Sequence, residues 1–267
     1  MTELRDRVAV ELGRALRADS LDNPWSDTAG ASTRTIYAPD GFLYEASRLR
    51  FHESVLEAHR ALTPSPVTGG SLAVVVTAGP PGSGKSTALE RMPELCGYRS
   101  IDADEFKDPL LLRAQADGLV DRWTARRLAD DRPVQLREIA GFVHAESTTV
   151  ADTLRRRALR NGENVVVHGT LSSVDYLDDL LAELDDAGYE KLRIVTVEVP
   201  LETAIAQATD RWWSVRDAAT DPLGGRFVPE AAIRRYYPTG STESVCGANA
   251  RVLGDRAADL GWDVSMV

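Results

Sequence analysis

Residues 72–87 read LAVVVTAGPPGSGKST, an apolar run followed directly by a glycine-rich segment. The first seven residues form a continuous apolar run rich in valine, which is typical of a strand buried on both faces. Residues 79–86 then match the pattern G-x-x-x-x-G-K-[ST] in full. Because the motif follows a predicted buried strand and precedes a predicted helix that begins at Lys85, we predict a phosphate-binding loop rather than a chance glycine-rich turn.

The residue types of this loop suit a bound nucleotide for physical reasons. Glycines allow successive backbone N–H groups to turn toward phosphate oxygens, and the N-terminal end of the following helix adds positive potential. Lys85 supplies a cation to the β- and γ-phosphates, and the Ser86 hydroxyl completes a Mg²⁺ coordination shell. We therefore expect ATP and Mg²⁺ as cofactors. The expected nucleotide-binding residues are Gly79, Pro80, Pro81, Gly82, Ser83, Gly84, Lys85, Ser86 and Thr87.

Further apolar runs indicate that the first strand belongs to a larger sheet. Strands are predicted at residues 98–101, 164–167, 192–197 and 262–266, and helices at 85–94, 133–160, 174–187 and 201–213. Strands that alternate with helices are typical of a parallel sheet with helices on both faces. We predict an α/β fold of the P-loop kinase type for residues 71–267.

The first 70 residues are predicted to form a helical extension. Apolar residues recur at every fourth position from Leu4 to Leu16, which predicts a helix that ends near Asp19. A second helix is predicted over residues 41–62, and residues 63–70, TPSPVTGG, form a linker by composition. The two helices either pack into the core of the same domain or bind a partner.

The composition excludes several classes of protein. With a net charge of −10, the chain lacks the surplus of Lys and Arg that general nucleic-acid binding requires. Two cysteines, Cys96 and Cys246, are too few for a disulfide framework, so we expect reduced thiols. The N-terminus is too charged for a signal peptide, and no apolar run approaches the length of a membrane span. We expect a cytoplasmic protein with no nucleic-acid or membrane partner.

Acidic residues follow the second predicted strand, where residues 101–107 read IDADEFK. The carboxyl ends of parallel strands face the ligand crevice, so acids at this position are expected near the γ-phosphate. One of Asp102 and Asp104 is predicted to receive the substrate proton, and the other to assist Mg²⁺ through water. The alternative is helix capping, which also places Asp before helices.

The third predicted strand and a later loop add further candidates. His168-Gly169-Thr170 follows the strand at 164–167, and Gly169 lets the backbone approach a ligand closely. A lone histidine is more often structural, but this position favours a ligand contact. Arg211, Arg216 and Arg226 flank a predicted flexible segment, residues 218–225. They are either solvated surface groups or parts of a lid that closes over the transferring phosphates.

Taken together, these motifs resemble the zeta toxin family, P-loop kinases of bacterial toxin–antitoxin systems. The resemblance rests on residues 79–87, 101–107 and 164–170 and on Arg211 and Arg226, and it covers about residues 72–237. It implies a kinase that uses ATP and Mg²⁺ to phosphorylate the sugar 3′-hydroxyl of UDP-N-acetylglucosamine, which blocks cell-wall precursor synthesis. It also implies an antitoxin as protein partner, for which the N-terminal helices are either a built-in substitute or plain scaffold.

The resemblance implies roles for individual residues. Lys85 matches the phosphate lysine of the family, and Asp104, the second acid of its pair, matches the general base. Arg211 and Arg226 match two lid arginines that contact phosphate. All four are therefore expected to be catalytic.

Four further positions are expected to bind the substrate. Thr170 and Asp152 match substrate-contacting residues of the family, and Asp102 lies in the acidic motif. His168 departs from the family, which usually has an acid at this position that holds the substrate. The acceptor is therefore left open. The alternatives are a phosphotransferase for another small hydroxyl substrate such as an antibiotic, resembling chloramphenicol phosphotransferases, and a nucleotide-dependent switch that binds a protein.

Overall fold

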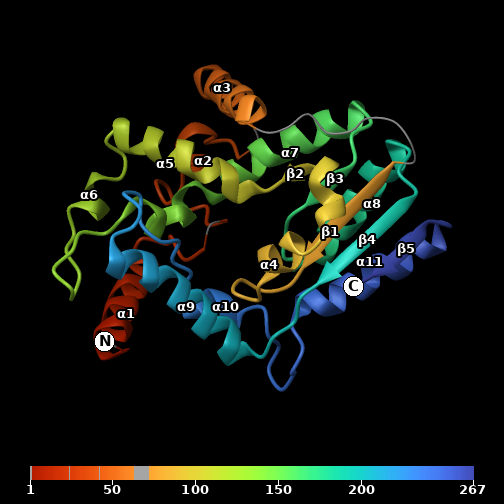
Figure 1. Ribbon diagram of the computed structural model, residues 1–267. Helices are drawn as coiled ribbons and strands as arrows, with labels where there is room; N and C mark the ends of the chain where they lie inside the picture. The colour runs from red at the N-terminus through yellow and green to blue at the C-terminus, as the bar shows by residue number, and fades with distance from the viewer. Residues whose placement is uncertain (1, 24, 42, 63–71) are drawn as a thin grey trace. The chain divides into compact units, whose positions relative to one another are not determined.

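The computed structural model describes residues 2–23, 25–41, 43–62 and 72–267 (Figure 1). The chain divides into two compact units. Unit 1 comprises Met1–Ala58, Ala103–Val150 and Ala206–Ala232, and unit 2 comprises His59–Asp102, Ala151–Ile205 and Ile233–Val267. The predicted linker at 63–70, and with it the predicted boundary after residue 70, lies outside the described residues.

A five-stranded parallel sheet is the centre of unit 2, so the predicted fold class is confirmed. The strand order is β2-β3-β1-β4-β5, with β1 (Ala73–Ala78), β2 (Arg99–Ile101), β3 (Val165–Val167), β4 (Lys191–Thr196) and β5 (Asp263–Met266). The central strand β1 pairs with β3 and β4, which places Val75 between Val166 and Arg193. Burial on both faces explains why β1 reads as an unbroken apolar run.

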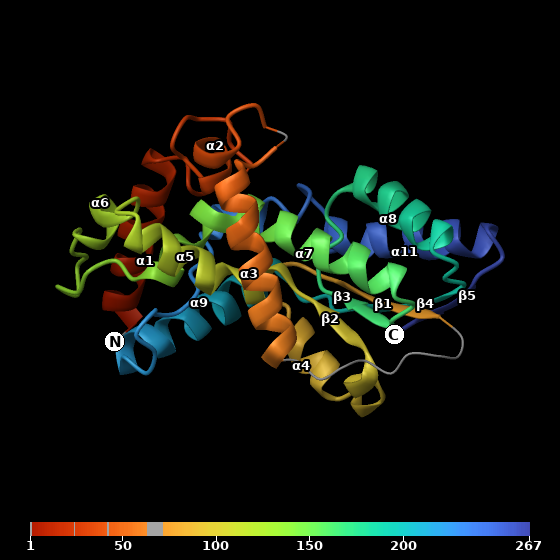
Figure 2. The ribbon, with the colours of Figure 1, turned by 90° about the horizontal axis from the view of Figure 1, so that it is seen from above.

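Helices cover both faces of this sheet. The helices of unit 2 are α4 (Lys85–Glu90), α8 (Val174–Asp186) and α11 (Val245–Asp259). Figure 2 shows α4 on one face of the sheet and α8 and α11 on the other. On the α4 face, a small core joins Val75, Val166 and Val195 to Ala88 and Leu89. The strand and the helix that flank the phosphate-binding loop are thus packed against each other.

Unit 1 is helical, and the N-terminal helix is part of its core. Its elements are α1 (Thr2–Ala18), α2 (Thr33–Tyr37), the 3₁₀ segments η2 (Ala103–Phe106) and η3 (Leu136–Val143), α5 (Lys107–Ala116) and α6 (Asp121–Thr124). The buried face of α1 carries Val8 and Leu12, which belong to the same apolar cluster as Leu110, Ile139 and Trp212. The first predicted helix is confirmed, and its apolar face is buried within the protein.

Several predicted helix boundaries are wrong. The helix predicted at 85–94 ends at Glu90, because Pro93 disfavours helical geometry in the residue before it, and the chain continues as the 3₁₀ helix η1 (Pro93–Gly97). The remaining helices are α3 (Ala46–Leu62), α7 (His144–Arg160), α9 (Leu201–Ala218) and α10 (Glu230–Arg234), each with residues in both units. Among them, α3 begins five residues later than predicted and α9 ends five residues later.

The helix predicted over residues 133–160 is wrong in its first third. This part is the 3₁₀ helix η3, in which Ile139 has non-helical angles (φ −105°, ψ 24°). Glu138 is wholly buried in η3, and both of its carboxylate oxygens accept N–H groups of Arg216, at 2.7 and 2.8 Å. A tertiary ion pair therefore overrides the local helical pattern.

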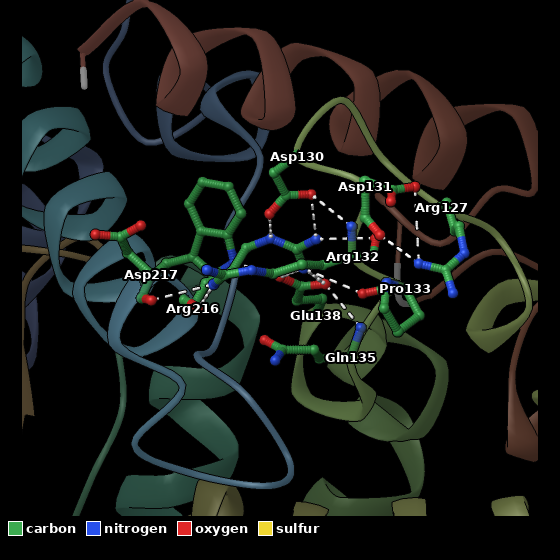
Figure 3. A network of polar contacts seen from close by, with 10 residues as sticks. Arg127, Asp130, Asp131, Arg132, Pro133, Gln135, Glu138, Arg216 and Asp217 are labelled. Carbon is green, nitrogen blue, oxygen red and sulfur yellow. Dashed lines mark hydrogen bonds and ion pairs between the residues drawn. The ribbon is translucent and has the colours of Figure 1, made fainter.

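Arg216 is a structural residue, so its predicted place on a lid is wrong. Its side chain is completely buried. Figure 3 shows its contacts with Glu138 and Asp130. It donates to both oxygens of Asp130 at 2.8 Å, and Trp212 Nε1 donates to Glu138 at 2.7 Å. This network fixes α9 to η3 inside unit 1.

Two further sequence expectations concern cysteines and membranes. Both Cys96 and Cys246 are free; the first is exposed and the second is buried. Within the described residues, no helix combines the length and the apolar character that a membrane crossing requires.

Candidate active site

The glycines of the loop between β1 and α4 adopt backbone angles that other residues avoid. Gly79, Gly82 and Gly84 have φ values of 144°, 86° and 95°. A Cβ atom on Gly79 would lie 2.4 Å from the backbone oxygen of Val197. Gly79 therefore lets the loop pass close to the end of β4. A larger residue at this position would push the loop away from the strand.

The side chains of the loop are arranged as a phosphate site requires. Lys85 curls back over the loop, and its Nζ donates to the backbone oxygens of Gly79 and Pro80 at 2.7 and 3.0 Å. Ser86 is exposed on the first turn of α4. The Ser83 hydroxyl is buried and has no hydrogen-bond partner among the described residues. A phosphate oxygen would supply an acceptor in this region, so the loop fits a nucleotide.

Mg²⁺ would depend on the nucleotide for most of its ligands. No group of three or more His, Cys, Asp or Glu residues that could hold a metal occurs in the described part of the chain. Mg²⁺ commonly takes few protein ligands and completes its shell with substrate phosphates and water. Ser86 is the residue of this loop that would coordinate Mg²⁺, through its hydroxyl.

Three polar side chains meet where β2 and β3 end. His168 Nε2 lies 3.2 Å from Ser100 Oγ, and its Nδ1 lies 3.8 Å from Asp102 Oδ2. Gly169, the residue after His168, is held by a residue of β1, because Gly169 N donates to Thr77 Oγ1 at 2.9 Å. The structure thus brings together two predicted substrate residues, Asp102 and His168, and adds Ser100, which the sequence analysis did not identify.

Thr170 is joined to the phosphate-binding loop through its backbone. Gly79 N donates to the Thr170 oxygen at 3.2 Å, and Thr170 Oγ1 donates to Ser172 Oγ at 3.1 Å. Burial raises the pKa of the Tyr236 phenol, and the hydroxyls of Thr170 and Ser172 oppose this shift. Tyr236 is far away in the sequence, and no motif pointed to it.

Asp152 lies on α7 in an ion pair rather than alone. Arg155 Nη1 donates to Asp152 Oδ1 at 2.7 Å, and the same guanidinium binds Glu183 and the Tyr176 hydroxyl. Burial raises the pKa of Asp152, although the guanidinium opposes this effect. Asp152 is therefore a half-buried acid with one strong partner.

Asp104 belongs to unit 1, where two cations hold its carboxylate. Arg226 Nη1 lies 2.7 Å from Asp104 Oδ2, and Lys107 Nζ lies 2.7 Å from Oδ1. Burial alone would raise the pKa of Asp104, but the two cations outweigh it and keep this pKa below its usual range. Lys107 was missed as a functional residue, although its position three residues after Asp104 in helical structure would have indicated the contact.

The remaining predicted arginine, Arg211, is also part of unit 1. It lies on α9 with an exposed side chain, whereas Arg226 is half-buried and paired with Asp104.

The profile of the AAA domain family matches residues 74–221, which is more than half of the chain and begins in β1. The chain belongs to this AAA domain family.

Solved structures show which folds this AAA domain resembles. A protein of the PezAT chromosomal toxin–antitoxin system of Streptococcus pneumoniae is 14% identical, with 84% of this chain and 77% of that chain covered and a TM-score of 0.56. The AvrRxo1-ORF1:-ORF2 complex with ATP is 17% identical, with a TM-score of 0.51. This match covers 80% of this chain but only 60% of that one. None of the curated proteins matches the chain in sequence.

These likenesses confirm the resemblance that the motifs indicated, at the level of the fold. The AAA domain therefore has a P-loop kinase-like fold. Its predicted residues fall into two groups. The phosphate-binding loop, Asp102, Asp152, His168 and Thr170 belong to unit 2, and Asp104, Arg211 and Arg226 to unit 1.

Proposed function

We propose that this AAA domain protein is an ATP-dependent kinase that phosphorylates a hydroxyl group of a small molecule. The observation that carries the proposal is the Asp104 carboxylate, which Arg226 and Lys107 keep ionised. An ionised carboxylate accepts hydrogen bonds only, so it suits a residue that orients an acceptor hydroxyl and takes its proton. In a nucleotide switch the corresponding residue would orient an attacking water instead of an acceptor hydroxyl, so an acceptor assay separates the two functions.

The proposed mechanism divides the work among residues of the chain. Bound ATP with Mg²⁺ supplies the phosphoryl group. Lys85, which curls over Gly79 and Pro80, would neutralise charge on the β- and γ-phosphates. Asp104 would orient the acceptor hydroxyl, and Arg211 and Arg226 would contact the phosphates, as the family resemblance implies. Because phosphoryl transfer proceeds through a loose transition state, positioning and charge stabilisation supply most of the catalysis.

We further propose UDP-N-acetylglucosamine as the acceptor, with phosphorylation at the sugar 3′-hydroxyl. The support is the set of motifs that resembles zeta toxins: the phosphate-binding loop, the acidic residues 101–107 and residues 164–170. His168 is the feature that favours a different small hydroxyl substrate instead. An antitoxin partner is proposed on the same resemblance, and the similar PezAT structure comes from a toxin–antitoxin system. Because the apolar face of α1 is buried in the core of unit 1, we propose that this helix is a scaffold element.

The test is mass spectrometry of reactions that contain the protein, ATP, Mg²⁺ and either UDP-N-acetylglucosamine or a metabolite extract. We expect a product heavier by one phosphate, and none with Lys85→Ala, whose folded stability should match the wild type. Phosphorylation of another extract component would replace the proposed acceptor but keep the kinase. ATP hydrolysis at a rate indifferent to every acceptor would favour the switch.

A further inference from the structure

Arg137 on η3 binds two separate segments of unit 1 at once. Its Nε and Nη2 donate to the two carboxylate oxygens of Asp108, at 2.9 and 2.7 Å. Its Nη1 donates to Asp221 at 2.7 Å and to the Gly224 oxygen at 3.2 Å. A bidentate guanidinium–carboxylate pair fixes orientation as well as distance. Arg137 therefore holds the start of α5 and the loop around residues 221–224 in one arrangement.

These two segments carry the residues of the proposed catalytic ion pair. Asp108 lies one helical turn after Asp104, and Gly224 lies two residues before Arg226. Arg226 bridges the same two segments, because it donates to the Asp104 backbone oxygen at 2.6 Å and pairs with its carboxylate. The Arg137 contacts and the Arg226 contacts thus run in parallel between the same pair of chain segments.

The loop has little room to move around these contacts. A Cβ atom on Gly225 would lie 2.5 Å from the backbone oxygen of Trp212, and one on Gly224 would lie 2.3 Å from Gln135 Oε1. Arg137 N also donates to the Leu223 oxygen at 2.9 Å. The segment that the sequence suggested as flexible is therefore packed closely just before Arg226.

The helix that carries Arg137 is itself anchored on its other side. The next residue, Glu138, lies in the buried network with Arg216 that Figure 3 shows. Neighbouring residues of η3 thus serve different contacts, because Glu138 binds α9 and Arg137 binds the Arg226 loop and α5. Arg137 is 22% exposed, and its bidentate pair with Asp108 fixes the direction as well as the distance of this contact.

We propose that Arg137 is a positioning residue that sets the Arg226–Asp104 ion pair for phosphoryl transfer. The kinetic part of this inference rests on the proposed kinase function. A shift of about 1 Å in a catalytic group costs about a hundredfold in rate. We therefore expect Arg137→Met to lower kcat about a hundredfold, while KM for ATP changes little. Arg137→Lys keeps the charge but loses the bidentate fork, so it should restore only part of the rate.

A double variant separates positioning from general structural damage. If Arg137 acts through Arg226, then Arg137→Met combined with Arg226→Met should be no slower than Arg226→Met alone. Multiplied losses in the double variant would overturn the proposal. Arg113→Met is the matched control, because Arg113 pairs with Asp117 on the exposed surface of α5 and is not in the site. It should keep the wild-type rate.

A second measurement does not depend on enzymatic activity. Hydrogen exchange should become faster in peptides that cover residues 219–229 in Arg137→Met and stay unchanged in Arg113→Met. Unchanged exchange in Arg137→Met, or equal acceleration in both variants, would overturn the positioning role. If the wild type phosphorylates no acceptor, the proposed function fails, and the exchange measurement still decides whether Arg137 fixes the loop.

Discussion

The Arg226 guanidinium binds Asp104 twice, once at the carboxylate at 2.7 Å and once at the backbone oxygen at 2.6 Å. The arginine therefore fixes both the charge and the orientation of this residue. Lys107 holds the second carboxylate oxygen. Because the pKa of Asp104 is held below its usual range, the carboxylate is a weak base at neutral pH that orients a hydroxyl well.

Asp104→Asn should keep the affinity for ATP and lose turnover by about 10²–10⁴-fold, because an amide can neither hold the acceptor hydroxyl with two acceptor oxygens nor take its proton. Steady-state kinetics with a nucleotide titration would check this. Asp102→Asn is the comparison: it should act through the metal or through positioning and regain part of its activity at higher Mg²⁺. If Asp102→Asn is the less active variant and Mg²⁺ has no effect on it, the two roles are reversed.

Arg216→Met should destabilise the protein by about 3–5 kcal/mol, because it leaves the buried carboxylates of Glu138 and Asp130 without their cation. Denaturant unfolding measures this loss. The double variant Arg216→Met/Glu138→Gln should lose less free energy of unfolding than Arg216→Met alone, because one of the two unpaired buried charges is removed. Arg113→Met, on the surface, should change little. Equal effects of Arg216→Met and Arg113→Met would contradict the structural role of the network.

His144 should make stability depend on pH. Burial, followed by the charge of Lys107, lowers its pKa from 6.5 to about 4, although Asp104 opposes the shift. Between these values the unfolded chain binds more protons than the folded chain, so stability falls as the pH falls from about 6.5 toward 4. His144→Gln should flatten the curve in this range. Parallel curves for the two proteins would show that His144 does not cause the dependence.

Local sequence patterns predicted the parts of the fold that depend on local physics. The valine run of β1 favours a buried strand, and the glycines at 79, 82 and 84 allow the positive φ angles that the loop requires. Ion pairs between residues far apart in the sequence could not be predicted from local patterns. Arg216 looks like a surface arginine in sequence, and only the folded chain brings Asp130 and Glu138 to it.

The candidate site shows the same division. Lys85 follows from its motif, and Lys107 could have been paired with Asp104 by helical spacing. Tyr236, which reaches Thr170 from 66 residues away, could not, because no periodicity links them. The family resemblance supplied a role for Asp104, but it gave no hint that Arg137 holds the same pair of segments.

His168 is the position where the chain departs from the zeta toxin pattern. A carboxylate there would only accept hydrogen bonds, whereas a neutral imidazole offers one donor and one acceptor. In the structure the ring already contacts Ser100 at 3.2 Å and approaches Asp102 at 3.8 Å. Burying a substrate hydroxyl against an unsuitable partner weakens its binding free energy by about 1–3 kcal/mol. This loss is enough to change the preference between acceptors by tens of fold.

We expect wild-type turnover on UDP-N-acetylglucosamine, and we expect His168→Glu to keep or raise it, because the carboxylate restores the usual acid of the family. His168→Gln is the matched control, since it keeps a donor and an acceptor without a charge next to Asp102. Rates of all three proteins on the sugar nucleotide and on a panel of small alcohols distinguish the cases. A wild type that is inert on the sugar nucleotide but active on another alcohol, with the preference shifted by His168→Glu, would identify a different acceptor. Equal rates for all three proteins on every acceptor would show that His168 does not contact the substrate.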